Sequence, residues 1–262
     1  MFDPSKTAAF LAAEHAARSR FEPLTGDLLP PDQTSAYAAG QALVELWRAG
    51  GRGNIAGYKI ALTSKAVQEM LGVNEPCAGA IFESVILHTP ARISRADYVR
   101  VGLEFEICLR LGKGLPGANA PYAADTVRDA VDAAIPAFEM VEDRNADYSK
   151  VNVESLIADN AWNGALVLGE VTGDWRTLDL SRTPVTLTYN DEIETADTGA
   201  ALGSPLTALA WLANLMVVQG RPLEAGMIVM TGSAMKTRFG EAGDRMRYEV
   251  EGLGSVEMDI TA

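Results

Sequence analysis

Two glutamates, Glu104 and Glu106, lie two positions apart in the segment GLEFEICLRL, residues 102–111. Apolar residues alternate with them, which is the pattern of a β-strand with one apolar face. Because side chains two positions apart share a face of a strand, the two carboxylates are neighbours and repel each other. Either this face lies in water, as many strand faces do, or a bound cation offsets the repulsion.

A third acid, Glu139, lies inside the apolar segment AAIPAFEMVEDR, residues 133–144. It shares a strand face with Ala137 and Val141, so open solvent around it is not expected, and a buried carboxylate needs a partner. Three carboxylates from two strands suit Mg²⁺ or Mn²⁺, hard cations that prefer oxygen ligands. Octahedral geometry then leaves about three positions for water or for a bidentate substrate.

Lys59 is the second candidate for chemistry, because it lies between Tyr58 and Ile60 in the apolar segment GYKIALTS. Burial or a nearby metal would lower the lysine pKa towards the range that is useful for proton transfer. Alternatively, the ammonium group extends to water from the end of the strand. Ser64 is predicted to cap the following helix, and the amides exposed there could bind a substrate carboxylate.

A third polar segment, MTGSAMKT, places Thr231, Gly232 and Ser233 where an apolar strand ends. These residues either form an ordinary turn or provide amide and hydroxyl groups that bind an anion. With only two histidines in the chain, a histidine-rich metal site is excluded. Cys77 and Cys108 lack the spacing of zinc ligands.

The composition is that of a folded protein, with 48% hydrophobic residues in a chain of 262. A formal charge of −13 argues against nucleic-acid and anionic-membrane partners, which need basic patches. No apolar run approaches the ~20 residues of a membrane span. The first residues, MFDPSKTAAFLAAEHAARSR, lack the unbroken apolar core of a signal peptide. We therefore expect a cytoplasmic protein.

Helical patterns dominate the start of the chain. Asp3 and Pro4 predict the first turn of an alanine-rich helix that reaches about Arg20. Asp32 or Thr34 is predicted to cap a second helix, which ends at a pair of glycines.

Residues 1–53 are therefore predicted to form a small helical appendage, and residues 54–262 a β-rich catalytic domain. Further helices are expected at residues 64–72, 123–134 and 204–220. Strands are expected at residues 57–63, 79–87, 101–112, 134–142, 164–170, 183–190, 226–232 and 245–260. Strands and helices do not alternate regularly, so a doubly wound parallel sheet is not expected. The predicted fold class is α+β, with a β-rich core shaped as a mixed sandwich, roll or distorted barrel.

Five of these segments occur together in one known family. They are GYKIALTSKAVQEMLGV, LEFEICLRLG, IPAFEMVEDR, ADNAWNGALVLGE and GMIVMTGS. In this order they resemble the branch of the fumarylacetoacetate hydrolase superfamily that contains 2-keto-4-pentenoate hydratase and 4-oxalocrotonate decarboxylase. The resemblance covers most of the chain. It implies the mixed β-sandwich or roll of that superfamily, with the N-terminal helices beside it.

The resemblance also implies roles for individual residues. Glu104, Glu106 and Glu139 match the three metal-ligand carboxylates of the family, and Lys59 matches the lysine proposed for acid–base work. Family members act on 2-hydroxydienoates, or on their keto tautomers, from the meta-cleavage of aromatic rings. They commonly form homo-oligomers, and a complex with a neighbouring pathway enzyme is a further option.

The implied substrate pocket includes Ser64 and residues 231–233. The cation would chelate the carboxylate and 2-oxo oxygens of the substrate and stabilise the enolate formed in the reaction. A hydratase then adds water at the conjugated carbon, whereas a decarboxylase releases carbon dioxide. Both enzymes are lyases.

Hydratase is the first expectation and decarboxylase the second. Many hydratases of the family carry an acid directly after the Glu-Pro pair that follows the lysine helix, where this chain has Cys77 and Ala78. A carbon–carbon bond hydrolase ranks third, because it relies on a histidine and neither His15 nor His88 lies in a matching motif. An inactive structural partner of a pathway enzyme is the remaining alternative, and the intact carboxylates argue against it.

Overall fold

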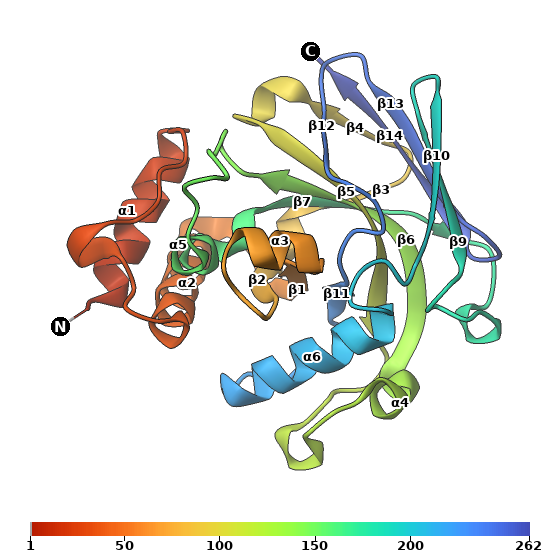
Figure 1. Ribbon diagram of the computed structural model, residues 1–262, viewed down its shortest axis with the longest axis horizontal. Helices are drawn as coiled ribbons and strands as arrows, with labels where there is room; N and C mark the ends of the chain where they lie inside the picture. The colour runs from red at the N-terminus through yellow and green to blue at the C-terminus, as the bar shows by residue number, and fades with distance from the viewer. Residues whose placement is uncertain (1) are drawn as a thin grey trace.

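Two β-sheets and several helices make up the protein, as the computed structural model shows for residues 2–262 (Figure 1). Within these residues one sheet has eight strands in the order β2-β1-β11-β5-β6-β7-β3, with β12 paired to β5. The other has six strands in the order β10-β9-β13-β14-β4, with β8 paired to β14. The predicted β-rich α+β fold is confirmed.

The strands of the larger sheet are β1 (Ile55–Ala61), β2 (Cys77–Phe82), β3 (Ile86–His88), β5 (Val101–Leu111), β6 (Val131–Glu142), β7 (Asn163–Leu168), β11 (Ile228–Met230) and β12 (Arg238–Phe239). Those of the smaller sheet are β4 (Ala91–Ser94), β8 (Glu170–Val171), β9 (Pro184–Tyr189), β10 (Glu192–Asp197), β13 (Arg245–Val250) and β14 (Gly254–Thr261). The hairpin of β13 and β14 was expected from the sequence, whereas β10 was not.

Aromatic side chains from both sheets meet in the core between them. Phe105 of β5 and Phe138 of β6 are fully buried, with ring centroids 5.7 Å apart. Tyr248 of β13 reaches this pair from the smaller sheet, 6.1 Å from Phe105. Because side chains alternate along a strand, Glu104 and Glu106 turn to the opposite face of β5, away from this core.

The larger sheet is curled, because its two edge strands are joined by a very short connection. Only the turn Glu83–Val85 separates β2 from β3, which lie at opposite ends of the strand order. Such a connection spans at most about 14 Å, whereas seven flat strands would extend over about 29 Å. Curling therefore brings side chains from distant strands together on the inner face. It also breaks the single strand predicted for residues 79–87 into two.

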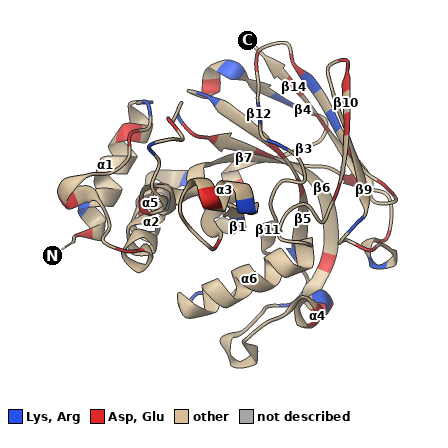
Figure 2. Cartoon of the chain, viewed as in Figure 1, with Lys and Arg blue, Asp and Glu red and all other residues tan. Residues whose placement is uncertain are grey.

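Six α-helices lie within the described residues. They are α1 (Pro4–Ala16), α2 (Gln33–Trp47), α3 (Lys65–Met70), α4 (Ala124–Val127), α5 (Val153–Ala158) and α6 (Pro205–Val218). The predicted caps are confirmed at three of them, where the side chains of Asp3, Asp32 and Ser64 accept hydrogen bonds from first-turn amides. Ser204 caps α6 in the same way. The α6 helix carries no charged residue (Figure 2) and is mostly buried.

The N-terminal helices share a core with the sheets. Leu11 of α1 and Leu43 of α2 are buried in the same apolar cluster as Ile60 of β1. The division into residues 1–53 and 54–262 stays a prediction. Each helix of residues 2–262 is too short or too polar to cross a lipid bilayer.

The helix predicted for residues 123–134 is wrong for most of its length. The α4 helix ends at Val127, a short 3₁₀ turn follows, and β6 begins at Val131. Ala133 and Ala134 pair with Arg110 and Leu109 of β5. Backbone pairing along this long central ladder outweighs the helix propensity of alanine, which is a weak preference.

The carboxylate of Asp159, directly after α5, contacts side chains from two distant segments of the chain. His15 Nε2 of α1 lies 2.6 Å from one carboxylate oxygen, and Arg144 Nη2, just beyond β6, donates to the other at 2.7 Å. Asp159 and Arg144 are both buried. Burial by itself raises the pKa of Asp159, but the charges and hydrogen bonds of His15 and Arg144 outweigh it and lower the pKa.

We predict that Asp159→Asn lowers the free energy of unfolding by about 3–5 kcal/mol, because it leaves the buried Arg144 without its countercharge. Urea denaturation measures the change. Because the folded-state pKa of Asp159 is lowered, its contribution is present above about pH 4 and is lost on acidification. The variant therefore loses part of the acid sensitivity below that pH. The control is Asp191→Asn in an exposed turn, and equal losses for both variants would contradict the account.

Candidate metal centre and cavity

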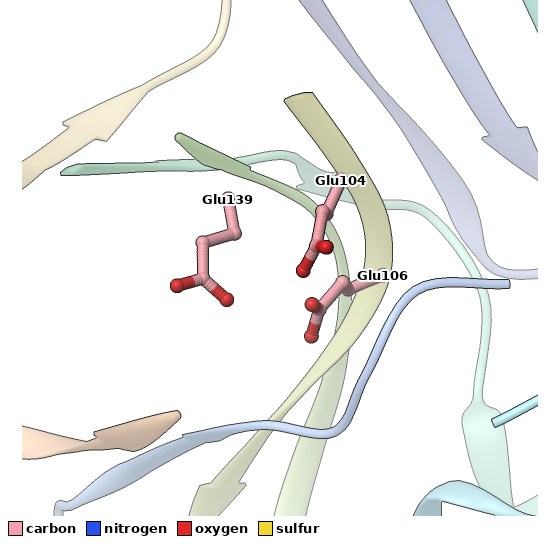
Figure 3. A group of neighbouring side chains, drawn as sticks. All are labelled: Glu104, Glu106 and Glu139. Carbon is pink, nitrogen blue, oxygen red and sulfur yellow. The ribbon is translucent and has the colours of Figure 1, made fainter. Parts of the chain in front are cut away.

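Three carboxylates meet on the inner face of the larger sheet (Figure 3). Glu104 of β5 lies directly opposite Glu139 of β6 in the antiparallel ladder, and Glu106 follows two residues later on the same face. One oxygen of each carboxylate lies within 4.8 Å of the others. The structure therefore brings together all three acids that the sequence singled out.

Each carboxylate is oriented by one hydrogen-bond donor from a neighbouring segment. The Thr237 hydroxyl donates to Glu104 at 2.8 Å, and the Asn163 amide donates to Glu139 at 3.4 Å. The backbone N–H of Gly232 donates to Glu106 at 2.8 Å. Gly232 has a φ of +102°, a conformation that favours glycine, so its residue type helps to aim this N–H.

The remaining carboxylate oxygens fit a hard divalent cation. Glu106 and Glu139 are fully buried, and Oε1 of Glu106 and Oε2 of Glu139 have no hydrogen-bond partner. Burial raises the pKa of Glu106 well above its ordinary value, and the neighbouring charges of Glu139 and Glu104 raise it further. Burial also raises the pKa of Glu139, to about 7, although Lys59 opposes the shift. Buried, mutually repelling oxygen ligands of this kind are stabilised by a bound cation.

Lys59 reaches this group from β1, although β11 and β5 lie between β1 and β6 in the sheet. The Lys59 side chain is 2% exposed, and Nζ lies 3.2 Å from Oε1 of Glu139. The alternative in which the ammonium extends to water is therefore wrong. The expected lowering of the lysine pKa is also corrected. Burial does lower the pKa, but Glu139, Glu104 and Glu106 outweigh burial and raise it overall.

A cavity of about 550 Å³ opens beside the carboxylates. Four of the predicted site residues line it, namely Lys59, Ser64, Glu104 and Ser233. Ser64 also caps α3 by accepting from the Val67 amide at 3.4 Å. Thus the capping role expected for Ser64 is confirmed, and the same residue borders the cavity.

Thr231 and Gly232 do not line the cavity. The Thr231 hydroxyl is buried and donates to the Ile107 carbonyl at 2.8 Å, whereas the Gly232 amide serves Glu106. Both residues fix the backbone beside β5. The segment 231–233 therefore combines support for β5 with one cavity-lining residue, Ser233.

Two of the orienting donors were missed by sequence reasoning. Asn163 lies directly before the strand expected at residues 164–170, and it is the first residue of β7. Thr237 lies at the end of MTGSAMKT, of which only residues 231–233 were selected. A single asparagine or threonine gives no signal by itself, because its role depends on the strand it meets after folding.

We predict that Glu106→Gln abolishes binding of Mg²⁺ or Mn²⁺, because it removes a charged ligand from the centre of the group. Thr237→Val leaves the ligands intact but misaligns Glu104, so it weakens affinity by about 10–100-fold. Isothermal titration calorimetry measures both effects. Glu251→Gln, an exposed glutamate in a turn, is the control. Unchanged affinity in Glu106→Gln would contradict the assignment.

Metal affinity is predicted to rise with pH. The buried carboxyl groups of Glu106 and Glu139 hold protons more tightly than usual, and a cation requires the ionised form. Binding therefore releases protons, and affinity increases about tenfold per pH unit for each proton released, up to a pH of about 7 for Glu139. Titrations in buffers of different ionisation enthalpy count the protons. Affinity that is constant between pH 5 and 8 would contradict this prediction.

Comparison with known proteins agrees with the geometry. Residues 60–261 match the family model described as "Fumarylacetoacetate (FAA) hydrolase C-terminal". The chain is 37% identical to 2-keto-4-pentenoate hydratase 2 of Dechloromonas aromatica, covering 97% of this chain and 95% of the relative. It is 32% identical to 2-hydroxyhexa-2,4-dienoate hydratase of Comamonas testosteroni, covering 91% of this chain and 90% of the relative.

A solved structure extends the match to nearly the whole fold. The 4-oxalocrotonate decarboxylase from Pseudomonas putida G7, complexed with magnesium and adipate, superimposes with a TM-score of 0.90 at 25% identity. The match covers 98% of this chain and 97% of the decarboxylase. Together with the sequence matches, this shows that the chain belongs to the fumarylacetoacetate hydrolase family, in the branch that contains the 2-keto-4-pentenoate hydratases.

Proposed function

We propose that the protein is a divalent-metal-dependent lyase, a hydratase that adds water to a 2-hydroxy-2,4-dienoate of the 2-keto-4-pentenoate type. Such compounds arise in the meta-cleavage degradation of aromatic rings. The observation that carries the proposal is the group of three carboxylates with Lys59 beside a cavity of about 550 Å³. Relatives at 37% identity that are named 2-keto-4-pentenoate hydratases support it.

Glu104, Glu106 and Glu139 are the proposed ligands of Mg²⁺ or Mn²⁺. When bound, the cation would supply Lewis-acid polarisation of the substrate carboxylate and 2-oxo group. The chain orients the ligands through the donors described above. Because these donors belong to the turn after β11 and to the start of β7, the carboxylates are held in place before any ligand enters.

Lys59 is the proposed acid–base residue. Its Nζ atom carries a proton next to Glu139, and Lys59 lines the cavity, so it can donate to the carbon chain of a substrate and later recover the proton. Ser64 and Ser233 line the same cavity and are the proposed contacts for substrate oxygens. Thr231 and Gly232 act in this proposal by holding β5 and Glu106 in place.

A decarboxylase of the 4-oxalocrotonate type is the second candidate. The structural match with a TM-score of 0.90 favours it, and so does the absence of an acid at Cys77. Cys77 is fully buried, pairs with Ala61 in the β1–β2 ladder and does not line the cavity. An acid at that position would act on Lys59 rather than directly on water, so its absence leaves hydration feasible.

A carbon–carbon bond hydrolase ranks below both candidates. His15 pairs with Asp159 and His88 is exposed at the end of β3, and neither histidine lines the cavity beside the carboxylates. We also propose that the protein forms a homo-oligomer, as members of this family commonly do, and a complex with a neighbouring pathway enzyme remains a further proposal.

The assignment predicts the products of a single assay. With Mg²⁺ present, the protein converts 2-hydroxypenta-2,4-dienoate to 4-hydroxy-2-oxopentanoate, which is followed by NMR. Parallel incubation with 2-oxohex-3-enedioate tests for decarboxylation. Loss of carbon dioxide from the second compound without hydration of the first would make the protein a decarboxylase. Inactivity towards both would contradict the proposed substrate class.

We predict that Lys59→Met lowers kcat by about 10²–10⁴-fold, because a positioned proton donor is lost. Methionine fills a similar volume without the charge. Calorimetry is expected to show that the variant still binds the cation, which separates proton transfer from metal binding. Lys113→Met, at an exposed position, is the control. Wild-type turnover in Lys59→Met would return Lys59 to a purely structural role.

A further inference from the structure

Two bulky side chains that line the cavity, Leu62 and Trp162, are held on strained backbone. Leu62 has a φ of 61° and Trp162 a φ of 57°, in the left-handed region that large L-residues rarely adopt. Ala161, beside Trp162, is also in this region with a φ of 47°. Such strain persists only where the surrounding structure enforces it, and it concentrates at binding sites.

The surroundings of Trp162 show what enforces this conformation. The Asn160 side chain bonds both backbone groups of Ala80, accepting from the amide at 2.6 Å and donating to the carbonyl at 2.9 Å. Gly79 allows the close approach, since a Cβ there would lie 2.2 Å from the Asn160 carbonyl oxygen. The Trp162 ring then packs edge-on against Phe21, with centroids 5.0 Å apart. The hydrogen bonds of Asn160 and the packing against Phe21 therefore hold Trp162 in this conformation.

Both polar and apolar side chains line the cavity. Lys59, Glu104 and Thr237 line it beside the group of three carboxylates. The other walls are mainly apolar and include Leu62, Val67, Met70, Leu156, Trp162 and Met235. These walls offer dispersion contacts and exclusion of water to an apolar group.

The cavity is also larger than a five-carbon substrate requires. 2-Hydroxypenta-2,4-dienoate has about eight non-hydrogen atoms, which need at most about 240 Å³ if each occupies the volume of a water molecule. The volume of about 550 Å³ therefore leaves more than half of the space beyond the dienoate. Most of the residues that line the cavity besides Lys59 and Glu104 are apolar.

The charged groups at the cavity give little attraction for a second carboxylate. Lys236 and Glu194 both line it, and Glu194 is paired with Arg238 at 3.1 Å. Arg238 also pairs with Glu192 at 2.7 Å. Among the lining residues, Lys59 and Lys236 are matched by Glu104 and Glu194, and this balance of charge disfavours a dicarboxylate over an apolar chain.

We propose that Leu62 and Trp162 determine specificity for a 2-hydroxy-2,4-dienoate that carries an extended apolar substituent at the end remote from its carboxylate. This inference rests on the proposed function, and it names the substrate class within it. Leu62 and Trp162 contact the substituent, Met70 borders it where the cavity opens, and the dienoate end lies at the carboxylates.

The test compares kcat/KM for three substrates in the presence of Mg²⁺. They are 2-hydroxypenta-2,4-dienoate, 2-hydroxyocta-2,4-dienoate and the dicarboxylate 2-hydroxyhexa-2,4-dienedioate. Burial of each added methylene is expected to raise kcat/KM about fourfold. The kcat/KM for the octadienoate should therefore exceed that for the pentadienoate by about 50-fold. A higher kcat/KM for the dicarboxylate than for the octadienoate would overturn the inference.

The variants identify the residues responsible. Trp162→Ala is expected to lower the octadienoate-to-pentadienoate ratio at least about tenfold, whereas Trp162→Phe retains most of it. The Phe variant matters because the buried Nε1 of Trp162 has no hydrogen-bond partner. An equal loss in Phe and Ala variants would mean that the N–H group, and not the apolar surface, sets the preference, and would overturn the inference.

A second variant covers the case in which Trp162→Ala does not fold. Met70 is 54% exposed, so Met70→Ala is expected to fold and to lower the ratio about threefold. Ile193→Ala, also exposed but outside the cavity, is the control. Hydration of all substrates without preference, or a ratio unchanged in Met70→Ala, would overturn the inference alone. No hydration of any substrate would overturn the proposed function and the inference with it.

Discussion

Repulsion among three carboxylates is the constraint on which the rest of the structure depends. Glu104, Glu106 and Glu139 lie within 4.8 Å of one another, and two of them are fully buried. One buried lysine cannot neutralise three such charges. Burial, together with the neighbouring carboxylates, raises the pKa of Glu106 and of Glu139. A divalent cation resolves it, and the surrounding fold keeps the carboxylates together until the cation binds.

The curl of the larger sheet is what makes this arrangement possible. It carries Lys59 from β1 to within 3.2 Å of Glu139 on β6, and it creates the inner face on which the cavity opens. The turns next to the strands supply the remaining residues of the site. The turn after β11 supplies the Gly232 amide, and the turn before β7 holds Trp162 in a strained conformation. Rigid strands therefore carry the proposed chemistry, while connecting turns shape the substrate space.

Much of this was predictable from local patterns. Alternation placed Glu104 and Glu106 on one face, the apolar context marked Glu139 as buried, and the order of five segments pointed to the family. The register was not predictable, because no local signal states that Glu104 pairs with Glu139. The ion pair of Lys59 was missed for the same reason, since sheet curling brings together residues that are far apart in sequence.

Other errors show tertiary structure overriding local preference. Residues 131–134 were expected to be helical, but they join the longest ladder of the sheet, in which β5 and β6 pair along most of their length. Likewise, burial of Lys59 suggested a lowered pKa. The three carboxylates that surround Lys59 in the folded chain raise its pKa instead, and the sequence does not show that they are neighbours. Predictions that depend on one segment were generally confirmed, and those that depend on a distant partner were not.

The most direct test of the metal centre is anomalous diffraction from crystals grown with Mn²⁺. The account predicts one strong anomalous peak with an oxygen of Glu104, Glu106 and Glu139 each at about 2.1–2.2 Å. It also predicts that the remaining coordination positions face the cavity beside Lys59. A peak at another position, or no peak while the Lys59–Glu139 pair stays as it is, would contradict the account.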